Sequence, residues 1–339
     1  MDNLLQGKDY QAQHNEKRKG IGKHIARITS VPEIGILIPL VLLIAVIGII
    51  KPIFFSVNNL SAVITGLAFI GIVSVGETMV ILFGEIDISL GSVAGLGAIL
   101  ATWFATKPHW DPVLSIIMAL IICAALGLIN GLLNVKIKMP SFIVTIGMLY
   151  VAKGAIYVIS KGYPIYPLPE MMRQIGRFTL FSSISLAFII FICLIIVFEF
   201  ILRKTNYGRY VYATGDNLQV AKLAGINVDV VKISAFVISG LLAGVSGILA
   251  TLSLESGLAT TGSGWEMQAI AASAIGGISL LGGSGTMIGT MIGMFILGVL
   301  NSGLVLIGMD TNWQTISVGV VMVVAVWIDI IRRNKKVKA

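Results

Sequence analysis

The sequence predicts an all-α polytopic membrane protein, and three observations lead to this fold class. Hydrophobic residues make up 56% of the 339 residues and charged residues only 12%, about half the charged share of an ordinary soluble domain. The mean hydropathy is +0.95. Apolar runs of about 17–25 residues, the length that a bilayer core requires, recur along most of the chain. A composition so poor in charge excludes a soluble enzyme, a nucleic-acid-binding domain and a disordered protein.

Ten segments have the length and apolar character of membrane helices: 33–50, 60–83, 88–106, 112–135, 141–160, 180–202, 231–253, 266–282, 285–308 and 313–331. Glycine-containing breaks at 84–87 and 282–285 separate two pairs of these segments. Each break could instead be a kink or a re-entrant turn. Glycines four residues apart, such as Gly240 and Gly244, predict closely packed helices. We also expect an inverted internal repeat, as in many transporters.

Positive charges indicate which way the helices cross the membrane. If the N-terminus is cytoplasmic, 18 Lys and Arg side chains lie on the inner side and five on the outer side, with Lys153 inside a span. This asymmetry is typical of membrane proteins. It predicts a cytoplasmic tail at 1–30, a membrane domain at 31–331 and a basic cytoplasmic tail at 332–339. Because topology accounts for the net charge of +8, we expect no nucleic-acid partner.

Three carboxyl side chains, Glu77, Glu85 and Asp87, lie within eleven residues of an otherwise apolar stretch. Each would cost on the order of 2.5–3.5 kcal/mol facing lipid at mid-span. We therefore expect them to face a cavity, the protein interior or the membrane boundary, or to be protonated. Lys153 could pair with one of them or extend to the membrane surface. The glycine, aspartate and serine around them favour a broken helix, with Ser89 or Asp87 capping the next one.

A helix that is broken at membrane depth lines a cavity or packs inside protein. We therefore predict that this stretch lines a path for a small polar substrate. The structural alternative is a helix cap with contacts between helices. The candidate path residues are Glu77, Glu85, Asp87, Ser89, Ser92 and, as an amide inside a late span, Asn301.

Sequence motifs of catalysis and nucleotide binding are missing from the chain. It has no G-x-x-x-x-G-K-[ST] phosphate loop, no H-E-x-x-H and only three histidines, which suggest no Ser–His–Asp arrangement. We expect a transporter or a subunit of one rather than an enzyme, with no cofactor and no metal bound by this chain. Two polar loops, 203–230 inside and 161–179 outside, are long enough to predict a function of their own.

Five stretches carry a family resemblance: FFSVNNL at 54–60, GETMVIL at 76–82 with IDISLGS at 86–92, YGRYVYA at 207–213 with GINV at 225–228, GWE at 264–266 with the small-residue run up to 283, and NSGL at 301–304. In order and spacing, from about residue 50 to 330, they resemble the ribose-type family of ABC permeases. Members of that family are membrane subunits of binding-protein-dependent importers for monosaccharides and related polyols.

This resemblance implies two permease copies, or two paralogues, side by side in the cytoplasmic membrane of a prokaryote. It implies an extracytoplasmic sugar-binding protein that delivers the sugar, and cytoplasmic ATPase subunits that bind ATP and Mg²⁺. The ATPase would dock on the loop at 203–230, through a short coupling helix at about 216–225. The candidate coupling residues are Tyr207, Gly208, Arg209, Asp216, Asn217, Lys222 and Gly225.

The sequence departs from the family pattern at two acidic positions. Where the family usually has Met or Gln, this chain has Glu77, and where it usually has Gly or Ser, this chain has Glu85. Two alternatives therefore stay open: an ion-coupled secondary transporter of a small polar solute with these acids and Asp87 as proton sites, or an ABC permease for another ligand such as an autoinducer or a nucleoside. The IDISLGS run favours the sugar branch. Leu218 and Val220 predict a more apolar docking surface for the ATPase.

Overall fold

The computed structural model describes residues 32–337, so the expected tail at 1–30 lies outside the described residues. Each of the ten predicted segments contains a helix. These helices are α2 (Pro32–Ile50), α3 (Val57–Ile81), α4 (Leu90–Ala105), α5 (Pro112–Val135), α6 (Ser141–Ser160), α8 (Leu186–Lys204), α11 (Val228–Leu254), α12 (Trp265–Ile275), α13 (Met287–Leu306) and α14 (Thr311–Val337). The shorter elements are a 3₁₀ helix (Pro52–Phe55), α7 (Glu170–Gly176), β1 (Thr179–Leu180), β2 (Ile184–Ser185), α9 (Asn206–Asp216) and α10 (Leu218–Leu223).

The all-α polytopic fold class is confirmed. Helices α3, α5, α6, α8, α11 and α13 are long and apolar enough to cross a membrane, and shorter apolar helices lie within α2, α4 and α14. The basic residues that were expected to form a separate tail from 332 onward continue α14 as far as Val337.

In two of the predicted spans the helix is shorter than the sequence predicts. The span at 180–202 begins only at Leu186, because residues 179–185 form an antiparallel hairpin of β1 and β2. The span at 266–282 is an 11-residue helix, α12, followed by irregular backbone. At a rise of about 1.5 Å per residue α12 covers roughly half of a bilayer core. The helix stops at Ile275 because glycines with positive φ follow it, at Gly277, Gly282 and Gly283.

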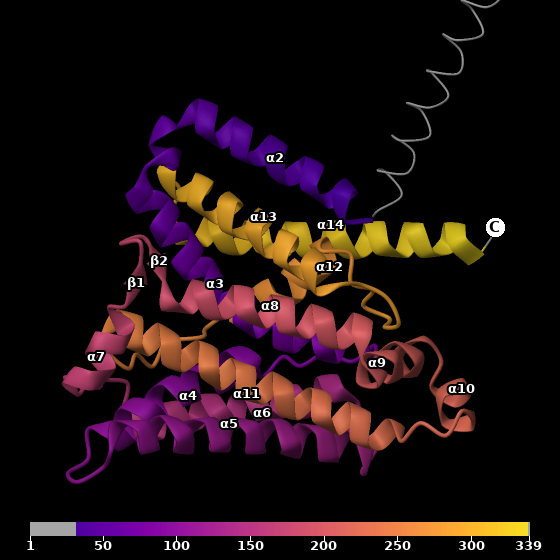
Figure 1. Ribbon diagram of the computed structural model, residues 1–339, viewed down its shortest axis with the longest axis horizontal. Coiled ribbons are helices and arrows are strands. Elements are labelled where there is room, and N and C mark those ends of the chain that lie inside the picture. Colours follow the sequence, from indigo (N-terminus) through magenta and orange to yellow (C-terminus); the bar gives the residue numbers. More distant parts are fainter. Residues whose placement is uncertain (1–31, 338–339) are drawn as a thin grey trace, which may run out of the picture.

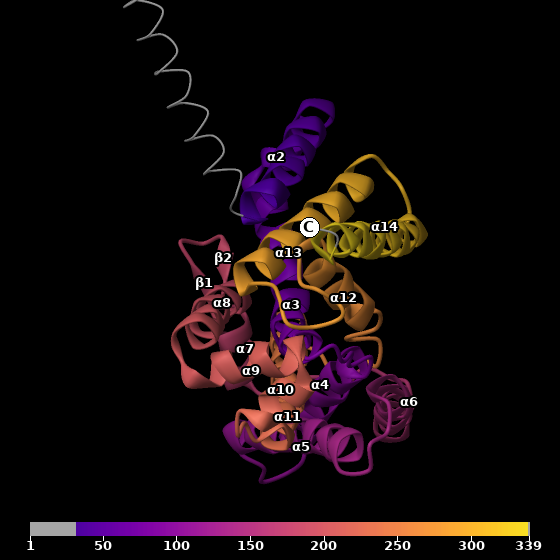
Figure 2. The ribbon, with the colours of Figure 1, turned by 90° about the vertical axis from the view of Figure 1, so that its right-hand side faces the viewer.

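The helices run roughly side by side along one axis, and the connections gather at the two ends (Figure 1). Helices α9 and α10 lie at one end, which we name the inner end, together with the start of α2 and the C-terminus. Helix α7 and the β1–β2 hairpin lie at the opposite, outer end. The start of α2 and the end of α14 thus lie at the same end, as the ten predicted crossings require. Viewed from the inner end, α6 and α14 lie on one side of the molecule and α8 on the other (Figure 2).

Helices α3 and α11 form the centre of the bundle. Of their most apolar 18-residue windows, 72% and 67% are buried, against 22% for α5 and 28% for α6. Helix α11 packs against α3, α4 and α5, and α12 packs against α3, α13 and α14. The peripheral helices therefore present apolar surface to lipid or to another protein, while the polar residues of α3 lie in the interior.

Glycine faces bring these helices together, as the spacing predicts. A Cβ atom on Gly244 of α11 would come 2.8 Å from Cβ of Cys123 on α5, and one on Gly240 would come 2.6 Å from the Cys123 carbonyl oxygen. On α13, a Cβ on Gly293 would overlap the Ala272 carbonyl oxygen of α12. Small residues at these positions are what allow the backbones to approach so closely.

Candidate functional site

The first interruption of the membrane helices lies at 82–89, between α3 and α4, where the sequence predicts a break. Gly84 adopts a φ of +73°, which other residues rarely reach. Glu77, at the end of α3, and Asp87, within the break, have no exposed surface. Both carboxyl groups therefore face the protein interior rather than lipid, which was one of the environments expected for them.

These two acids belong to a buried hydrogen-bonded cluster that joins three segments. Glu77 Oε1 accepts from the Asp87 backbone N–H at 3.2 Å. Asp87 Oδ1 accepts from the Ser89 N–H at 3.0 Å and from its hydroxyl at 2.5 Å, and Asn130 of α5 donates to Ser89 Oγ at 3.1 Å. Of the two residues expected to cap α4, Ser89 occupies the position before the helix but its hydroxyl is engaged by Asp87 and makes no capping bond, whereas Asp87 accepts from the Ser89 N–H at the entry to the helix.

Glu85 makes a separate contact at the inner edge of the same break. Its Oε1 lies 2.6 Å from Nζ of Lys232, in the first turns of α11, and the two side chains are only 20% and 15% exposed. This ion pair ties the break to the helix that follows the cytoplasmic loop. Lys153, which was considered as a partner of the three acids, is exposed on α6 and lines a cavity together with Glu266 of α12.

A second interruption lies at 276–286, between α12 and α13, and it packs directly on the first. The Gly283 N–H donates to the Leu82 carbonyl oxygen at 2.9 Å. A Cβ on Gly282 would lie 2.7 Å from the Gly84 backbone nitrogen. The sequence predicts the two breaks separately. In the structure they pack against each other and form one irregular region at the inner end.

The cytoplasmic loop contains two helices. Helix α10 lies within the predicted coupling segment at 216–225, and Asn217 begins it by accepting from the N–H groups of Gln219 and Val220 at 3.0 and 3.1 Å. The preceding helix, α9, begins at a capping Thr205. Asn217 satisfies N–H groups that the first turn of a helix leaves without partners, so the chain turns sharply between α9 and α10.

The remaining candidate coupling residues are spread over both helices and the turn after them. On α9, the Tyr207 hydroxyl lies 2.8 Å from Ser234 Oγ, Gly208 packs on the Leu202 backbone and Arg209 pairs with Asn206. Asp216 ends α9, Lys222 lies in the last turn of α10 and Gly225 follows with a φ of +81°. The exposed apolar side chains of α10 are Leu218, Val220 and Leu223.

Helix α9 touches both interruptions. A Cβ on Gly215 would overlap the Leu82 carbonyl oxygen and would lie 2.7 Å from the Gly283 nitrogen. The Tyr212 hydroxyl donates to the Gly285 carbonyl oxygen at 2.7 Å. A displacement of α9 must therefore move the irregular backbone of both breaks, because close-packed atoms at these distances cannot slide past one another freely.

Glu199 of α8 is a residue of this site that the sequence reading missed. Its Oε2 accepts from the N–H groups of Met287 and Ile288 at 2.8 and 3.4 Å, at the start of α13, and the carboxylate also pairs with Arg203. A carboxylate at this position satisfies free N–H groups and interacts favourably with the helix dipole. The signal was available, since Glu199 is an acid inside an otherwise apolar span.

The structure separates the six candidate path residues into different groups. Glu77, Asp87 and Ser89 share the buried cluster, and Glu85 lies beside it. Ser92 lines a cavity between α4, α6 and the segment leading into α12. Asn301 of α13 donates weakly, at 3.4 Å, to Gln268 of α12. They therefore do not line one common surface in this conformation.

Comparison with known proteins identifies the family. Residues 59–326 match the family described as the permease component of branched-chain amino acid transport systems. The ribose import permease of Escherichia coli K12 is 36% identical over 88% of this chain and 93% of its own length, and that of Bacillus subtilis is 36% identical over 88% and 92%. The autoinducer 2 import permease of Photorhabdus luminescens is 35% identical over 88% and 89%. No solved structure matches the chain.

The chain is a transport permease, a multi-pass protein of a prokaryotic inner membrane. It belongs to the ribose-type family of ABC permeases.

Proposed function

We propose that this chain is the membrane subunit of an ABC importer that carries a monosaccharide, a ribose-like pentose or a related sugar, into the cell. The observation that carries the proposal is the contact of α9 with both inner interruptions, through Gly215 and Tyr212. A cytoplasmic motor needs such a connection to the path, whereas a secondary carrier does not. The ribose import permeases among the relatives support the sugar as substrate class.

The motor is a separate ATPase that binds ATP and Mg²⁺, and this chain holds no cofactor of its own. The ATPase docks on the loop at 203–230 of this chain, where Leu218, Val220 and Leu223 are exposed on α10. Exposed apolar side chains at the inner end suit a protein partner better than water. The residues assigned to this contact are Tyr207, Gly208, Arg209, Asp216, Asn217, Lys222 and Gly225.

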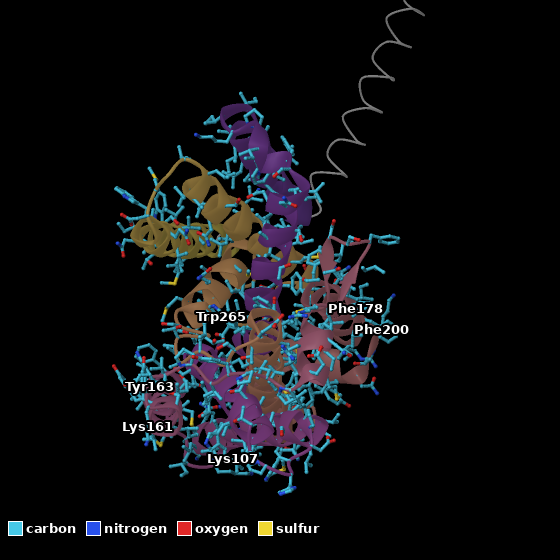
Figure 3. The ribbon with its side chains drawn as sticks, turned by 90° about the vertical axis from the view of Figure 1, so that its left-hand side faces the viewer. Lys107, Lys161, Tyr163, Phe178, Phe200 and Trp265 are labelled. Atoms are coloured by element: carbon cyan, nitrogen blue, oxygen red, sulfur yellow. The ribbon has the colours of Figure 1, made fainter. Side chains whose placement is uncertain are left out.

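A sugar-binding protein delivers the substrate at the outer end, and a second permease copy or paralogue completes the membrane unit within the lipid bilayer. Figure 3 views the outer end and labels Lys107 and Lys161 on that face. Charged residues of this kind steer a partner of complementary charge. The proposed contacts are Lys51, Lys107, Asp111, Lys161, Glu170, Arg173 and Arg177.

Within the membrane domain at 31–331, the substrate path passes the inner break and the cavity beside Ser92. Glu77, Glu85, Asp87, Ser89, Ser92 and Asn301 are the residues assigned to it. Weak contacts along such a path suit transport, because tight binding would retain the substrate.

Reconstitution tests the proposal. Vesicles that contain this permease and its ATPase are loaded with ATP, and binding protein with radiolabelled ribose is added outside. We expect uptake that requires both ATP and binding protein. Uptake that persists without ATP, or that follows a proton gradient instead, would overturn the importer function in favour of an ion-coupled carrier.

A second candidate substrate is autoinducer 2, because autoinducer 2 import permeases are about as similar to this chain as the ribose permeases are. The same vesicles distinguish the two substrates when each is offered with its own binding protein. Transport of the autoinducer alone would keep the ABC mechanism and replace the sugar.

A further inference from the structure

A polar cavity lies between α4, α6 and the irregular segment 255–264 that leads from α11 into α12. Its volume is about 110 Å³. Roughly 10–15 Å³ of such space is enough for one water molecule, so this cavity accommodates several waters or one small solute. Its polar lining is supplied by Ser92, Lys153, Tyr157, Thr260, Ser263 and Glu266.

Close backbone contacts hold the cavity at membrane depth. A Cβ on Gly91, in the first turn of α4, would overlap Glu266 Oε2 and the Gly262 carbonyl oxygen, and one on Gly95 would overlap the Thr261 carbonyl oxygen. The irregular segment therefore rests on the first turns of α4, with the Glu266 carboxylate directly against Gly91. Irregular backbone at this depth is tolerated where it is buried in protein or lines a water-filled cavity.

Two opposite charges face the cavity from different helices. Lys153 lies seven residues before Ser160, the last residue of α6, which is about 10 Å along the helix, and an ammonium group facing lipid at that depth is costly. Glu266, in the first turn of α12, lines the same cavity. Both groups line the cavity, and the structure shows no ion pair between them within the residues that it describes.

The lining specifies the chemistry of that ligand. One ammonium and one carboxylate cancel in charge, which disfavours an anion or a cation of the same size. The carboxylate accepts hydrogen bonds from hydroxyl groups and the ammonium donates to them. Thr261, whose Oγ1 is buried without a hydrogen-bond partner among the described residues, and Tyr157 also line the cavity.

We propose that this cavity is a subsite for a neutral polyhydroxylated solute, such as a monosaccharide ring, whose hydroxyl groups bridge Lys153 and Glu266. The proposal rests on the importer function above and adds where in the membrane the sugar is held. Trp265, adjacent to Glu266, lies on the side of the molecule where Lys161 and Tyr163 follow α6, away from Phe178 and Phe200 (Figure 3).

Thiol protection tests the subsite without the binding protein. In full-length protein in vesicles, with the exposed Cys193 replaced by serine, Ser92→Cys and Thr260→Cys are labelled separately with a small charged thiol reagent. Ribose is expected to slow labelling of both cysteines several-fold, and ribose 5-phosphate is not. Lys161→Cys, outside the cavity, is the matched control and should label at the same rate with and without ribose.

Removing either charge should weaken the protection. Glu266→Gln and Lys153→Met, each combined with Ser92→Cys, are expected to require about tenfold more ribose for the same effect, because each loses a charge-assisted hydrogen bond. Protection by leucine in place of ribose would overturn the proposal in favour of a zwitterion. Energised ribose uptake with neither cysteine protected would overturn the subsite and leave the importer intact. Protection without uptake would support the subsite and overturn the importer.

Discussion

Two interruptions of the membrane helices face opposite ends of the molecule and are built in different ways. The inner one, at 82–89 between α3 and α4, is filled by its own polar side chains. The outer one, at 255–264 between α11 and α12, encloses a cavity of about 110 Å³. In each case a long helix, a break and a shorter helix follow one another, and the outer segment reaches the first turns of the helix that follows the inner break.

The difference between them assigns a role to each. The inner interruption touches α9 through Gly215 and carries the Glu85–Lys232 pair, so it is closed and mechanically connected to the cytoplasmic side. The outer interruption is tied to its neighbours by the Ile165–Gly257 bridge and by contacts of 261–262 with α4. It leaves polar groups free for a solute. In the importer proposed above, this arrangement alternates and the motor acts on the closed half.

The largest effect on transport is expected from Gly215→Ala. The added methyl group would overlap the Leu82 carbonyl oxygen and approach the Gly283 nitrogen to 2.7 Å, and neither backbone atom can rotate away. Overpacking of this kind costs about 1–3 kcal/mol, and we expect ATP-driven uptake to be lost with it. Thermal unfolding in detergent and vesicle uptake measure the two effects.

Gly147→Ala is the matched control, since a Cβ there meets no atom within 4 Å and alanine favours the helix by up to about 1 kcal/mol. If Gly215→Ala retains both stability and uptake, α9 does not hold the two inner breaks together.

The next prediction compares two replacements of Glu77, by alanine and by glutamine. Alanine removes the acceptor of the Asp87 N–H and leaves a cavity in a fully buried place, so we expect a loss of about 2–4 kcal/mol in the free energy of unfolding. Glutamine keeps an oxygen in the same place and should stay within about 1 kcal/mol of the parent protein. Denaturant titration in mixed micelles compares them. Equal losses would mean that the charge, not the hydrogen bond, stabilises the break.

A double-mutant cycle on Glu85 and Lys232 is expected to give a smaller effect. Because both side chains are largely buried, each of Glu85→Gln and Lys232→Met should cost about 1–3 kcal/mol by leaving a buried polar group without its partner, and the double variant less than the sum. The exposed Lys136–Asp229 pair is the control, with a coupling energy of about 0–1 kcal/mol. Additive losses at Glu85 and Lys232 would show that the pair does not fasten the break to α11.

The sequence was sufficient to predict features that depend on neighbouring residues, and not those that depend on distant ones. Glycine, aspartate and serine at 84–92 predict the inner break, and the burial of Glu77 and Asp87 follows from the cost of exposing carboxylates to lipid. The resemblance locates the coupling segment close to α10.

Contacts between residues that are far apart in the sequence were not predicted. Lys232 meets Glu85 across 147 residues, and Glu199 meets the start of α13 across 88 residues. No local pattern encodes such a pairing, because it depends on which helices lie side by side. For the same reason Ser92 and Asn301, which were grouped with the acids by residue type, lie in other parts of the bundle.

The smallest effect is expected at the outer end, where Arg177, after α7, holds Glu255, after α11, at 2.6 and 3.0 Å. The hydrogen bond from Arg177 lowers the pKa of Glu255 below its ordinary value of 4.5. A carboxyl whose pKa is lowered on folding stabilises the folded state above its ordinary pKa, and this contribution is lost as the pH falls through the lowered value. Because the pair is exposed, little stability depends on it.

Hydrogen–deuterium exchange of residues 170–177, corrected for the intrinsic rate at each pH, measures this effect. The parent protein should keep its protection down to pH 4.5 and lose part of it below. Glu255→Gln should exchange faster than the parent above pH 4.5, approach the parent rate in acid and show no such step. If the acid step survives in that variant, it belongs to another carboxyl group of the outer end, and Glu170, which pairs with Arg173, is the first to replace. In that case the ion pairs of α7 lie within α7 and do not connect it to the outer interruption. The outer interruption is then held in place by the contacts of 261–262 with α4 alone.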